Sequence, residues 1–252
     1  MLIFIPTYNE AENVEALYNQ IVALGLDTDL LFLDDNSPDG TGQIIDRLAA
    51  ASPRVHTIHR TGKLGIGSAH VVGINWAYEN GYTSLLTMDC DFTHSPSFIP
   101  DFIKNGEDHD LVIASRFLSM DSMPEWNLFR RTLTHGGHFA TKLFLKMPLD
   151  ATGAFRLYRL DRIDRRIFDL VESRGYAFFF ESLYVLWLNQ VRVKEIPVSL
   201  PARTQGHSKM AVHDAIQSFR TLLALYKRKL NQPETLRYNP APQVAQKAST
   251  AR

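Results

Sequence analysis

Short apolar runs alternate with longer segments of helical spacing through the first 115 residues, and this alternation constrains the fold more than any other feature. The apolar runs have the length of buried strands and lie at 2–5, 30–33, 55–58, 85–88 and 111–114. The helical segments between them lie at 11–24, 41–51, 66–80 and 97–106. Strands that alternate with helices in this way form βαβ units. We therefore predict an α/β protein with a mainly parallel central sheet flanked by helices.

The second half of the chain has a different pattern. Its apolar spacing predicts helices at 128–146, 160–173, 178–189 and 207–229, and a strand at 191–200. From residue 231 onward the chain is rich in Pro, Ala and Gln and has no apolar period. We expect residues 1–230 to form a single domain and 231–252 to be a disordered tail.

Composition excludes several classes of protein. The net charge of the 252 residues is zero, so there is no overall basic field for nucleic acid. A single cysteine, Cys90, excludes an intrachain disulfide and suits a reducing compartment. The longest apolar-rich stretch, 176–188, contains Glu181 and Ser182 and is shorter than the roughly 20 residues of a membrane span. We expect no transmembrane helix, so a lipid substrate would be met from outside the bilayer.

Polar and turn-forming residues follow every predicted strand of the first half. In an open parallel sheet, ligands bind outside the carboxyl ends of the strands. The segments at those ends are PTYNE (6–10), DDNSPDGT (34–41), HRTGKLGIG (59–67), DCDFTH (89–94) and SR (115–116). Their convergence on one edge predicts a ligand site there.

The chain contains three Asp-x-Asp pairs, and only one of them follows a strand. The pairs at 27–29 and 108–110 precede their strands, which favours solvated turns at the opposite edge. Asp89 and Asp91 face the expected ligand site. Two carboxylates without a neighbouring Cys/His cluster suit Mg²⁺ or Mn²⁺ carrying a diphosphate. Cys90 points the other way in an extended segment and is not expected to bind the metal.

Asp34 and Asp35 end the second predicted strand. A carboxylate at this place can hold a ribose hydroxyl or a base N–H. The alternative is a turn or a helix N-cap, since Asn36, Ser37 and Asp39 all suit a turn. Function is favoured for Asp35, and the two interpretations of Asp34 stay open.

These stretches together resemble family 2 glycosyltransferases, which have the Rossmann-like GT-A fold. The polyprenol-phosphate mannosyltransferase branch, that of dolichol-phosphate mannose synthase, is the most similar. PTYNE, DDNSPDGT, GKLGIGSA, the Asp-x-Asp, SR, TGAFRLYR (152–159) and QGHSKM (205–210) occur in that order over about residues 2–212. The resemblance implies that 1–115 binds the nucleotide-sugar and that 116–230 binds the acceptor.

The resemblance also implies site residues. Catalytic roles would fall to Asp89, Asp91 and Arg116, with Mg²⁺ or Mn²⁺ on the two aspartates. The nucleotide-sugar would contact Pro6, Tyr8, Glu10, Leu33, Asp35, Lys63, Asp89, Cys90 and Asp91. The acceptor phosphate would contact Arg116, Arg131, Arg203, Ser208 and Lys209. The implied reaction is an inverting transfer of a hexose, most typically mannose from GDP-mannose, to a polyprenyl or dolichyl monophosphate.

Two residues depart from the branch. Thr93 stands where Gln is often a further metal ligand, which puts the third protein ligand in doubt. Phe179 stands where Gln is common, which puts sugar recognition near Glu181 in doubt.

A phosphate acceptor is already anionic at neutral pH and needs cations more than a base. Arg130 is a further candidate cation, and Asp150 or Glu181 is the candidate if a base is required.

The helix expected at 207–229 is amphipathic and ends in Lys-Arg-Lys. It suits packing on the domain, contact with anionic lipid, or both. We therefore expect a cytoplasmic protein in peripheral contact with the cytosolic face of a membrane.

Other functions remain as alternatives. One is a family 2 enzyme that uses another nucleotide-sugar, such as UDP-glucose, or a soluble acceptor. A nucleotidyltransferase would have a Gly-rich loop bearing Arg or Lys after the first strand, and PTYNE is not one. A catalytically silent binding module is disfavoured by the intact Asp-x-Asp and the matched cations.

Overall fold

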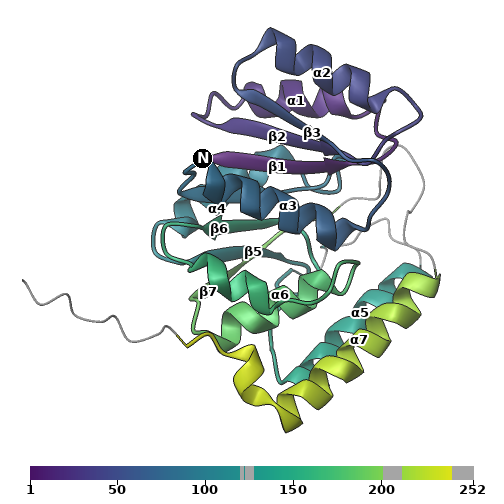
Figure 1. Cartoon of the computed structure of the whole chain (residues 1–252), viewed down its shortest axis with the longest axis vertical. Helices are drawn as coiled ribbons and strands as arrows, with labels where there is room; N and C mark the ends of the chain where they lie inside the picture. The colour runs from purple at the N-terminus through teal and green to yellow at the C-terminus, as the bar shows by residue number, and fades with distance from the viewer. Residues whose placement is uncertain (120–121, 123–127, 201–211, 240–252) are drawn as a thin grey trace, which may run out of the picture.

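A seven-stranded sheet forms the centre of the molecule (Figure 1). The computed structural model describes residues 1–119, 122, 128–200 and 212–239. The strand order is β3-β2-β1-β4-β6-β5-β7. The strands are β1 (Leu2–Thr7), β2 (Asp29–Asp34), β3 (Val55–His59), β4 (Ser84–Thr87), β5 (Leu111–Ser115), β6 (Arg156–Arg159) and β7 (Val193–Pro197). The predicted α/β class and all five predicted strands of the first half are confirmed.

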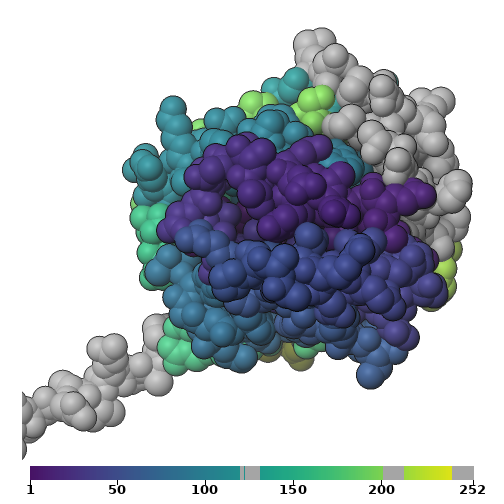
Figure 2. All heavy atoms as spheres, turned by 90° about the horizontal axis from the view of Figure 1, so that it is seen from above, coloured from purple at the N-terminus to yellow at the C-terminus, as the bar shows by residue number. Residues whose placement is uncertain are grey.

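Helices cover both faces of this sheet. The helices are α1 (Val14–Val22), α2 (Thr41–Ala51), α3 (Ile66–Glu79), α4 (Ile99–Gly106), α5 (Leu128–Leu145), α6 (Phe178–Leu188) and α7 (Val212–Asn231). Short 3₁₀ helices lie at η1 (Pro96–Phe98), η2 (Arg165–Leu170) and η3 (Pro233–Leu236). Seen from the side of α1 and α2, the purple and blue N-terminal elements spread across the surface (Figure 2).

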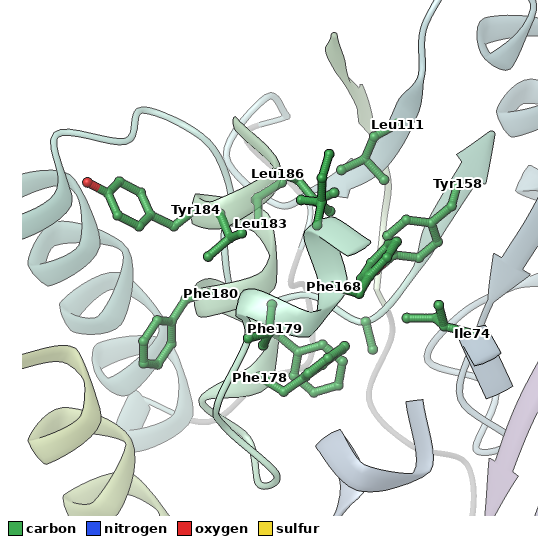
Figure 3. Close-up of a cluster of buried hydrophobic side chains, with 14 of the residues drawn as sticks. Ile74, Leu111, Tyr158, Phe168, Phe178, Phe179, Phe180, Leu183, Tyr184 and Leu186 are labelled. Carbon is green, nitrogen blue, oxygen red and sulfur yellow. The ribbon is translucent and has the colours of Figure 1, made fainter. Parts of the chain in front are cut away.

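The apolar core lies in two layers, one on each face of the sheet. Successive β1 side chains point to opposite faces, so Phe4 joins one layer and Ile5 the other. The first layer contains residues of α3 and α6, and the second contains residues of α1, α2 and α4. In the first layer, Phe178 and Phe179 of α6 lie with Phe168 and Tyr158 in a cluster of aromatic rings (Figure 3). Because both faces are covered, strands β1, β2, β4 and β5 are buried along almost their whole length.

Strand β6 runs against its neighbours and was not predicted. It pairs antiparallel with β4 and with β5, whereas β1 with β2, β1 with β4, β2 with β3 and β5 with β7 are parallel. Two antiparallel steps restore the direction of β5, so Ser115 ends at the same edge as Thr87. The reversal also brings the residues that precede β6, including Asp150 and Thr152, to that edge.

Two predictions about the second half are wrong. Residues 160–173 do not form an α-helix but only the 3₁₀ helix η2. The backbone of Asp164 is extended, with a ψ of 125°, and its carboxylate accepts a hydrogen bond from the Arg166 N–H at 2.9 Å, so Asp164 interrupts the predicted helix and caps the start of η2. Residues 231–239 are not a disordered tail. Leu236 is fully buried, and its carbonyl accepts a hydrogen bond from Asn189 at 2.9 Å. Tyr238 also packs against the core, and its N–H donates to Asn189 at 2.6 Å, so two side chains anchor this segment without an apolar period. The rest of the predicted tail, 240–252, lies outside the described residues.

Candidate active site

The carboxyl ends of β1, β2, β3, β4 and β5 meet at one edge of the sheet, as the alternation predicted. Asp29 begins β2, and its carboxylate accepts a hydrogen bond from the Tyr82 hydroxyl at 2.7 Å. Asp110 precedes β5 and forms an ion pair with Arg192. The two other Asp-x-Asp pairs therefore lie at the amino edge, and only Asp89 and Asp91 reach the candidate site.

Hydrogen bonds fasten the loop after β1 to the loop after β2. The backbone N–H of Asn9 donates to the Ser37 hydroxyl at 2.9 Å, and that of Glu10 donates to the Thr41 hydroxyl at 2.8 Å. Asp34 accepts from both the N–H and the hydroxyl of Ser37. Asp34 therefore has the turn role that the sequence left open. These bonds hold the expected nucleotide-binding loops in a fixed relation.

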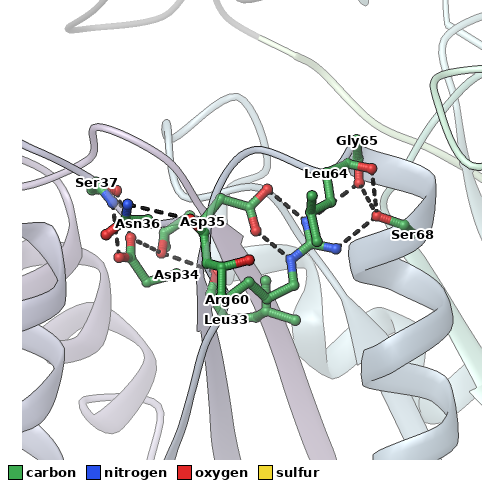
Figure 4. Close-up of polar contacts among 11 residues, drawn as sticks. Leu33, Asp34, Asp35, Asn36, Ser37, Arg60, Leu64, Gly65 and Ser68 are labelled. Carbon is green, nitrogen blue, oxygen red and sulfur yellow. Dashed lines mark hydrogen bonds and ion pairs between the residues drawn. The ribbon is translucent and has the colours of Figure 1, made fainter.

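Asp35 forms a buried ion pair with Arg60, the residue that follows β3 (Figure 4). Both carboxylate oxygens accept from the guanidinium, at 2.5 and 2.6 Å, and the two side chains are 9% and 8% exposed. Arg60 also donates to the Ser68 hydroxyl at 2.6 Å. Any ligand group at Asp35 would therefore meet an aspartate–arginine pair. Sequence reasoning missed Arg60, although it lies inside the quoted HRTGKLGIG.

The other expected nucleotide contacts lie on the strands and loops at the same edge of the sheet. The ammonium of Lys63 lies 5.1 Å from the centre of the Tyr8 ring, which is a cation–π distance. Pro6 lies opposite Leu33 in the β1–β2 ladder. Leu33 is fully buried, and its carbonyl accepts a hydrogen bond from the Thr7 hydroxyl at 3.1 Å, so this residue lies beneath the surface that a ligand would meet. Glu10 accepts a hydrogen bond from Asn13 at 2.7 Å. The structure thus brings all six residues implied for the nucleoside to the same edge.

Asp89 and Asp91 follow β4 in a tight turn whose central residue, Phe92, has a left-handed φ of 60°. The Asp91 carboxylate is buried, and its Oδ1 accepts from the hydroxyl of Thr93 at 2.6 Å and from the Thr93 N–H at 3.1 Å. The Asp89 N–H donates to Nδ1 of His94 at 2.8 Å. Thr93, at the position where a third metal ligand was in doubt, therefore orients one of the two aspartates.

The donor set at Asp89 and Asp91 fits a hard divalent cation. Asp89 is one-third exposed, so a ligand can reach it. Across the described ranges, no group of three or more His, Cys, Asp or Glu residues is arranged to hold a metal. A cation such as Mg²⁺ commonly takes one or two carboxylates and completes its shell with substrate phosphate and water. Cys90 is buried in the core, so its thiol cannot reach such a ligand.

Arg116, which follows β5, is buried against Asp150 and Thr152. Its Nε and Nη2 donate to the Asp150 carboxylate at 2.8 and 2.5 Å, and Nη2 also donates to the Thr152 hydroxyl at 2.5 Å. Burial opposes ionisation of Asp150, but the charge and hydrogen bonds of Arg116 outweigh it and lower the pKa of Asp150 below its ordinary value. Asp150 is therefore a partner of Arg116, which argues against a role as general base.

Glu181, like Asp150, is hydrogen-bonded to other groups of the protein. Its carboxylate accepts from the backbone N–H groups of Glu172 and Ser173, at 3.1 and 2.9 Å. It is buried, with the Arg228 guanidinium 3.8 Å away. These bonds hold the loop before α6. Because both oxygens of the Glu181 carboxylate accept backbone hydrogen bonds, the geometry argues against a role as general base.

The remaining expected acceptor contacts are only partly visible. Arg131 lies on α5 and is exposed. Arg203, Ser208 and Lys209 lie outside the described residues. The described residues therefore include the expected donor contacts and, of the expected acceptor contacts, Arg116 and Arg131.

The family model for "Glycosyl transferase family 2" matches residues 2–166, which contain six of the seven strands of the sheet. The chain belongs to this family. It is a glycosyltransferase, and the resemblance seen in the sequence is confirmed.

Two curated proteins match this glycosyltransferase over most of both chains. It is 35% identical over 212 residues to the "Undecaprenyl-phosphate mannosyltransferase" of Micrococcus luteus, covering 84% of this chain and 87% of the relative. It is 34% identical over 215 residues to the "Polyprenol monophosphomannose synthase" of Mycolicibacterium smegmatis, covering 83% and 80%.

Solved structures of lower sequence identity share the fold. The structure of S. aureus TarS 1-349 superposes with a TM-score of 0.56 at 15% identity, over 90% of this chain and 65% of that one. The mannosyltransferase PcManGT from Pyrobaculum calidifontis, in complex with GDP-Man and Mn²⁺, gives a TM-score of 0.51 at 16% identity, over 91% and 63%. The chain thus spans slightly less than two thirds of these structures, and the expected GT-A fold is confirmed.

Proposed function

We propose that this glycosyltransferase transfers mannose from GDP-mannose to a polyprenyl monophosphate, with inversion at the anomeric carbon and with Mg²⁺ or Mn²⁺ as cofactor. The observation that carries the proposal is the similarity to two enzymes named for polyprenyl-phosphate mannose synthesis, over at least 80% of each relative. The mannosyltransferase solved with GDP-Man and Mn²⁺ has the same fold, which is compatible with this donor and metal.

The donor side of the site suits a nucleoside diphosphate sugar. Asp89 and Asp91 would hold the metal, and Asp35 with Pro6, Tyr8, Glu10 and Lys63 would meet the nucleoside, with the buried Leu33 beneath them. When bound, the metal neutralises negative charge that develops on the leaving diphosphate. The hydrogen bonds of Thr93 and His94 fix the metal-binding turn before any substrate arrives.

The acceptor side suits a phosphate monoester better than an alcohol. A phosphate monoester has a second pKa of about 6, so its oxygen is already a nucleophile at neutral pH. An alcohol acceptor would need a general base, and both candidate bases, Asp150 and Glu181, are engaged with other groups. Arg116 and Arg131, with Arg203, Ser208 and Lys209, would instead bind the acceptor phosphate and screen its charge.

A partition assay tests the proposal. The protein is incubated with Mg²⁺ or Mn²⁺, a short polyprenyl phosphate and labelled GDP-mannose or UDP-glucose, and transfer of label to the organic phase is measured. We expect a lipid product from GDP-mannose and none when the free polyprenol replaces its phosphate. A product from UDP-glucose alone would correct the donor, and no lipid product from any donor would refute the acceptor.

Substitution of the metal-binding aspartates makes the assay specific. Asp89→Ala or Asp91→Ala should lower turnover by at least about 10²–10³-fold, the loss that follows removal of a key electrostatic contact. Asp27→Ala is the matched control, because Asp27 belongs to another Asp-x-Asp pair and contacts Arg54 at the surface. Equal losses in all three variants would mean that the effect is not local to the metal site.

We also propose peripheral contact with the membrane that contains the acceptor. In the described residues, no helix combines the length and the apolar character of a membrane span. Helices α5 and α7 pack side by side through Phe144 and Tyr226, yet both leave large apolar side chains exposed. These side chains are Leu133, Phe139 and Leu143 on α5 and Ile216, Phe219 and Leu230 on α7. Helix α7 therefore packs on α5 and also carries exposed apolar side chains that contact with lipid would use.

Two of the three basic side chains in the Lys-Arg-Lys end of α7 already contact other groups of the protein. Arg228 forms an ion pair with Glu172 at 2.9 Å, and Lys229 donates to the Phe144 carbonyl at 3.0 Å. Contact with lipid would therefore depend more on the exposed apolar residues. Binding to anionic vesicles should fall in Phe139→Ser but not in Val22→Ser, a matched exposed residue on α1. No binding to vesicles would refute this contact, and equal losses in Phe139→Ser and Val22→Ser would refute the role of the exposed apolar residues.

A further inference from the structure

Arg156, the first residue of β6, is fully buried and has an unusual set of partners. Its guanidinium donates four hydrogen bonds, all to neutral acceptors. Among the described residues, no carboxylate lies within ion-pair distance of it. A buried charge without an opposite charge is expensive, and an apolar residue of similar volume would avoid that cost. The directions of its four bonds give a reason for an arginine here.

Two of these bonds fix the segment that holds Arg116. Arg156 Nη2 donates to the Ala151 carbonyl at 3.0 Å, and Nε donates to the Gly153 carbonyl at 2.8 Å. The residue between them, Thr152, accepts from the Arg116 guanidinium, and the residue before them, Asp150, forms the ion pair with it. The backbone on both sides of Thr152 is thus held by one buried side chain.

The other two bonds reach α6. Nη2 donates to the Phe179 carbonyl at 2.8 Å, and Nη1 donates to the Ser182 hydroxyl at 3.1 Å. In the sheet, Arg156 lies opposite Thr87 of β4 and Ile113 of β5, whose strands lead to Asp89 and Arg116. Arg156 therefore links α6 to the Arg116 segment at the centre of the sheet, below the ligand edge.

We propose that Arg156 is a positioning residue that holds Arg116 in the orientation needed to bind the acceptor phosphate. The substrate part of this statement rests on the proposed function. Arg156 itself is fully buried and does not touch the substrate. It acts through the hydrogen bonds of Ala151 and Gly153, which place the two partners of the Arg116 guanidinium.

The variant Arg156→Lys separates geometry from charge. Lysine keeps the positive charge, but its single nitrogen cannot reproduce the planar fork that reaches four separate acceptors. We expect the KM for polyprenyl phosphate to rise about tenfold to a hundredfold, the scale of a misplaced binding group, with the KM for the donor unchanged. Arg159→Lys is the matched control, because Arg159 ends the same strand and forms a partly exposed ion pair with Asp161. Equal changes in both KM values, or an equal effect of Arg159→Lys, would overturn the proposal.

A double-mutant cycle tests whether Arg156 acts through Arg116. If it does, Arg156→Lys should have little further effect on the acceptor KM in an Arg116→Lys background. Additive effects would show that Arg156 works by another route. Ser182→Ala, which removes one of the four acceptors, should give a smaller effect in the same direction and serves if Arg156→Lys does not fold.

A direct measurement keeps this test separate from the proposed function. The Arg116 Nε–H donates to Asp150 in the native protein, and its NMR signal can be assigned by its loss in Arg116→Lys. We expect faster hydrogen exchange at this Nε–H in Arg156→Lys or Ser182→Ala, and no change in Arg159→Lys. An unchanged signal in the first two variants refutes the positioning role. If Arg116→Lys leaves the acceptor KM unchanged, the acceptor assignment fails, while the exchange rates still decide the role of Arg156.

Discussion

The pairs Asp35–Arg60 and Asp150–Arg116 are both bidentate, both buried, and both at the carboxyl edge of the sheet. On the donor side the group expected to meet a ligand is the carboxylate, and arginine supports it. On the acceptor side the roles are exchanged. The exchange has a physical consequence, since a carboxylate that loses its partner can take up a proton, whereas a guanidinium keeps its charge. Removing one partner should therefore destabilise the fold more when the partner that remains is the arginine than when it is the aspartate.

The largest effect is expected from Asp150→Asn. This change leaves the buried Arg116 without an opposite charge and should lower the free energy of unfolding by about 3–5 kcal/mol. Urea denaturation followed by circular dichroism measures the loss. A loss below about 1 kcal/mol would mean that Thr152 and backbone groups satisfy Arg116 without Asp150.

The pH dependence of the same variant checks the cause. Arg116 lowers the pKa of Asp150 in the folded state. The ion pair therefore stabilises the fold fully at pH values above the pKa of an aspartate in the unfolded chain, which is about 3.9. It is lost as the pH falls through the lower folded pKa. The difference in unfolding free energy between wild type and Asp150→Asn should therefore be constant from about pH 5 to pH 8 and shrink below about pH 4. A difference that changes between pH 6 and pH 8 would contradict the assignment.

A smaller effect is expected from Arg60→Met. It removes the charged hydrogen bonds to Asp35 and should lower the free energy of unfolding by about 1.5–3 kcal/mol. The carboxylate that remains has a route to neutralisation, which is why the loss should be smaller than for Asp150→Asn. Side-by-side urea curves of the two variants test the contrast, and an equal or larger loss for Arg60→Met would break it.

Thr93→Val extends the comparison to a carboxylate held by a neutral group. Loss of the hydroxyl that donates to Asp91 should weaken Mn²⁺ binding about tenfold, the lower end of the range for groups that orient metal ligands. Thr93→Ser keeps the hydroxyl and is the control. Binding is measured by electron paramagnetic resonance with GDP present. Unchanged Mn²⁺ affinity in Thr93→Val would show that the hydrogen bond from Thr93 to Asp91 does not contribute to metal binding.

The smallest effect is expected where the same geometry is exposed. Arg192 also forms a bidentate pair, with Asp110 at 2.7 and 3.1 Å, but its side chain is 62% exposed. Solvent screens such a pair, so Arg192→Ala should leave the melting temperature unchanged within error. A clear decrease in calorimetry would show that bidentate geometry matters more than burial in this protein.

The first half of the chain, 1–115, was predictable because its structure follows from patterns in consecutive residues. Each strand, its loop and the following helix are consecutive, so the position of Asp89 after an apolar run already placed it at the ligand edge. The helix 41–51 was predicted with its observed bounds. Proximity of Tyr8 to Lys63 followed from the same rule, although their contact is formed between separate loops.

The acceptor half was less predictable because its contacts are between distant segments. The four residues of β6 have no turn or period that signals an antiparallel insertion between β4 and β5. The partner of Arg116 is 34 residues away, and nothing near Asp150 in the sequence announces the pairing. Arg156 shows the limit most clearly, since its role depends on four acceptors from two separate segments. Spacing within one segment cannot specify contacts of this kind.

The reversed strand β6 also limits how the chain can be divided. A fragment ending before Ala151 would leave β4 and β5 without the strand that joins them, so the proposed nucleotide-sugar half, 1–115, is not a separable unit. A fragment ending near residue 166 would retain a continuous six-stranded sheet and would lack only the edge strand β7 among the strands. Protein engineers who wish to exchange acceptor modules between such enzymes should therefore place the junction after β6, because a junction at the apparent change of pattern near residue 115 would cut the sheet in two.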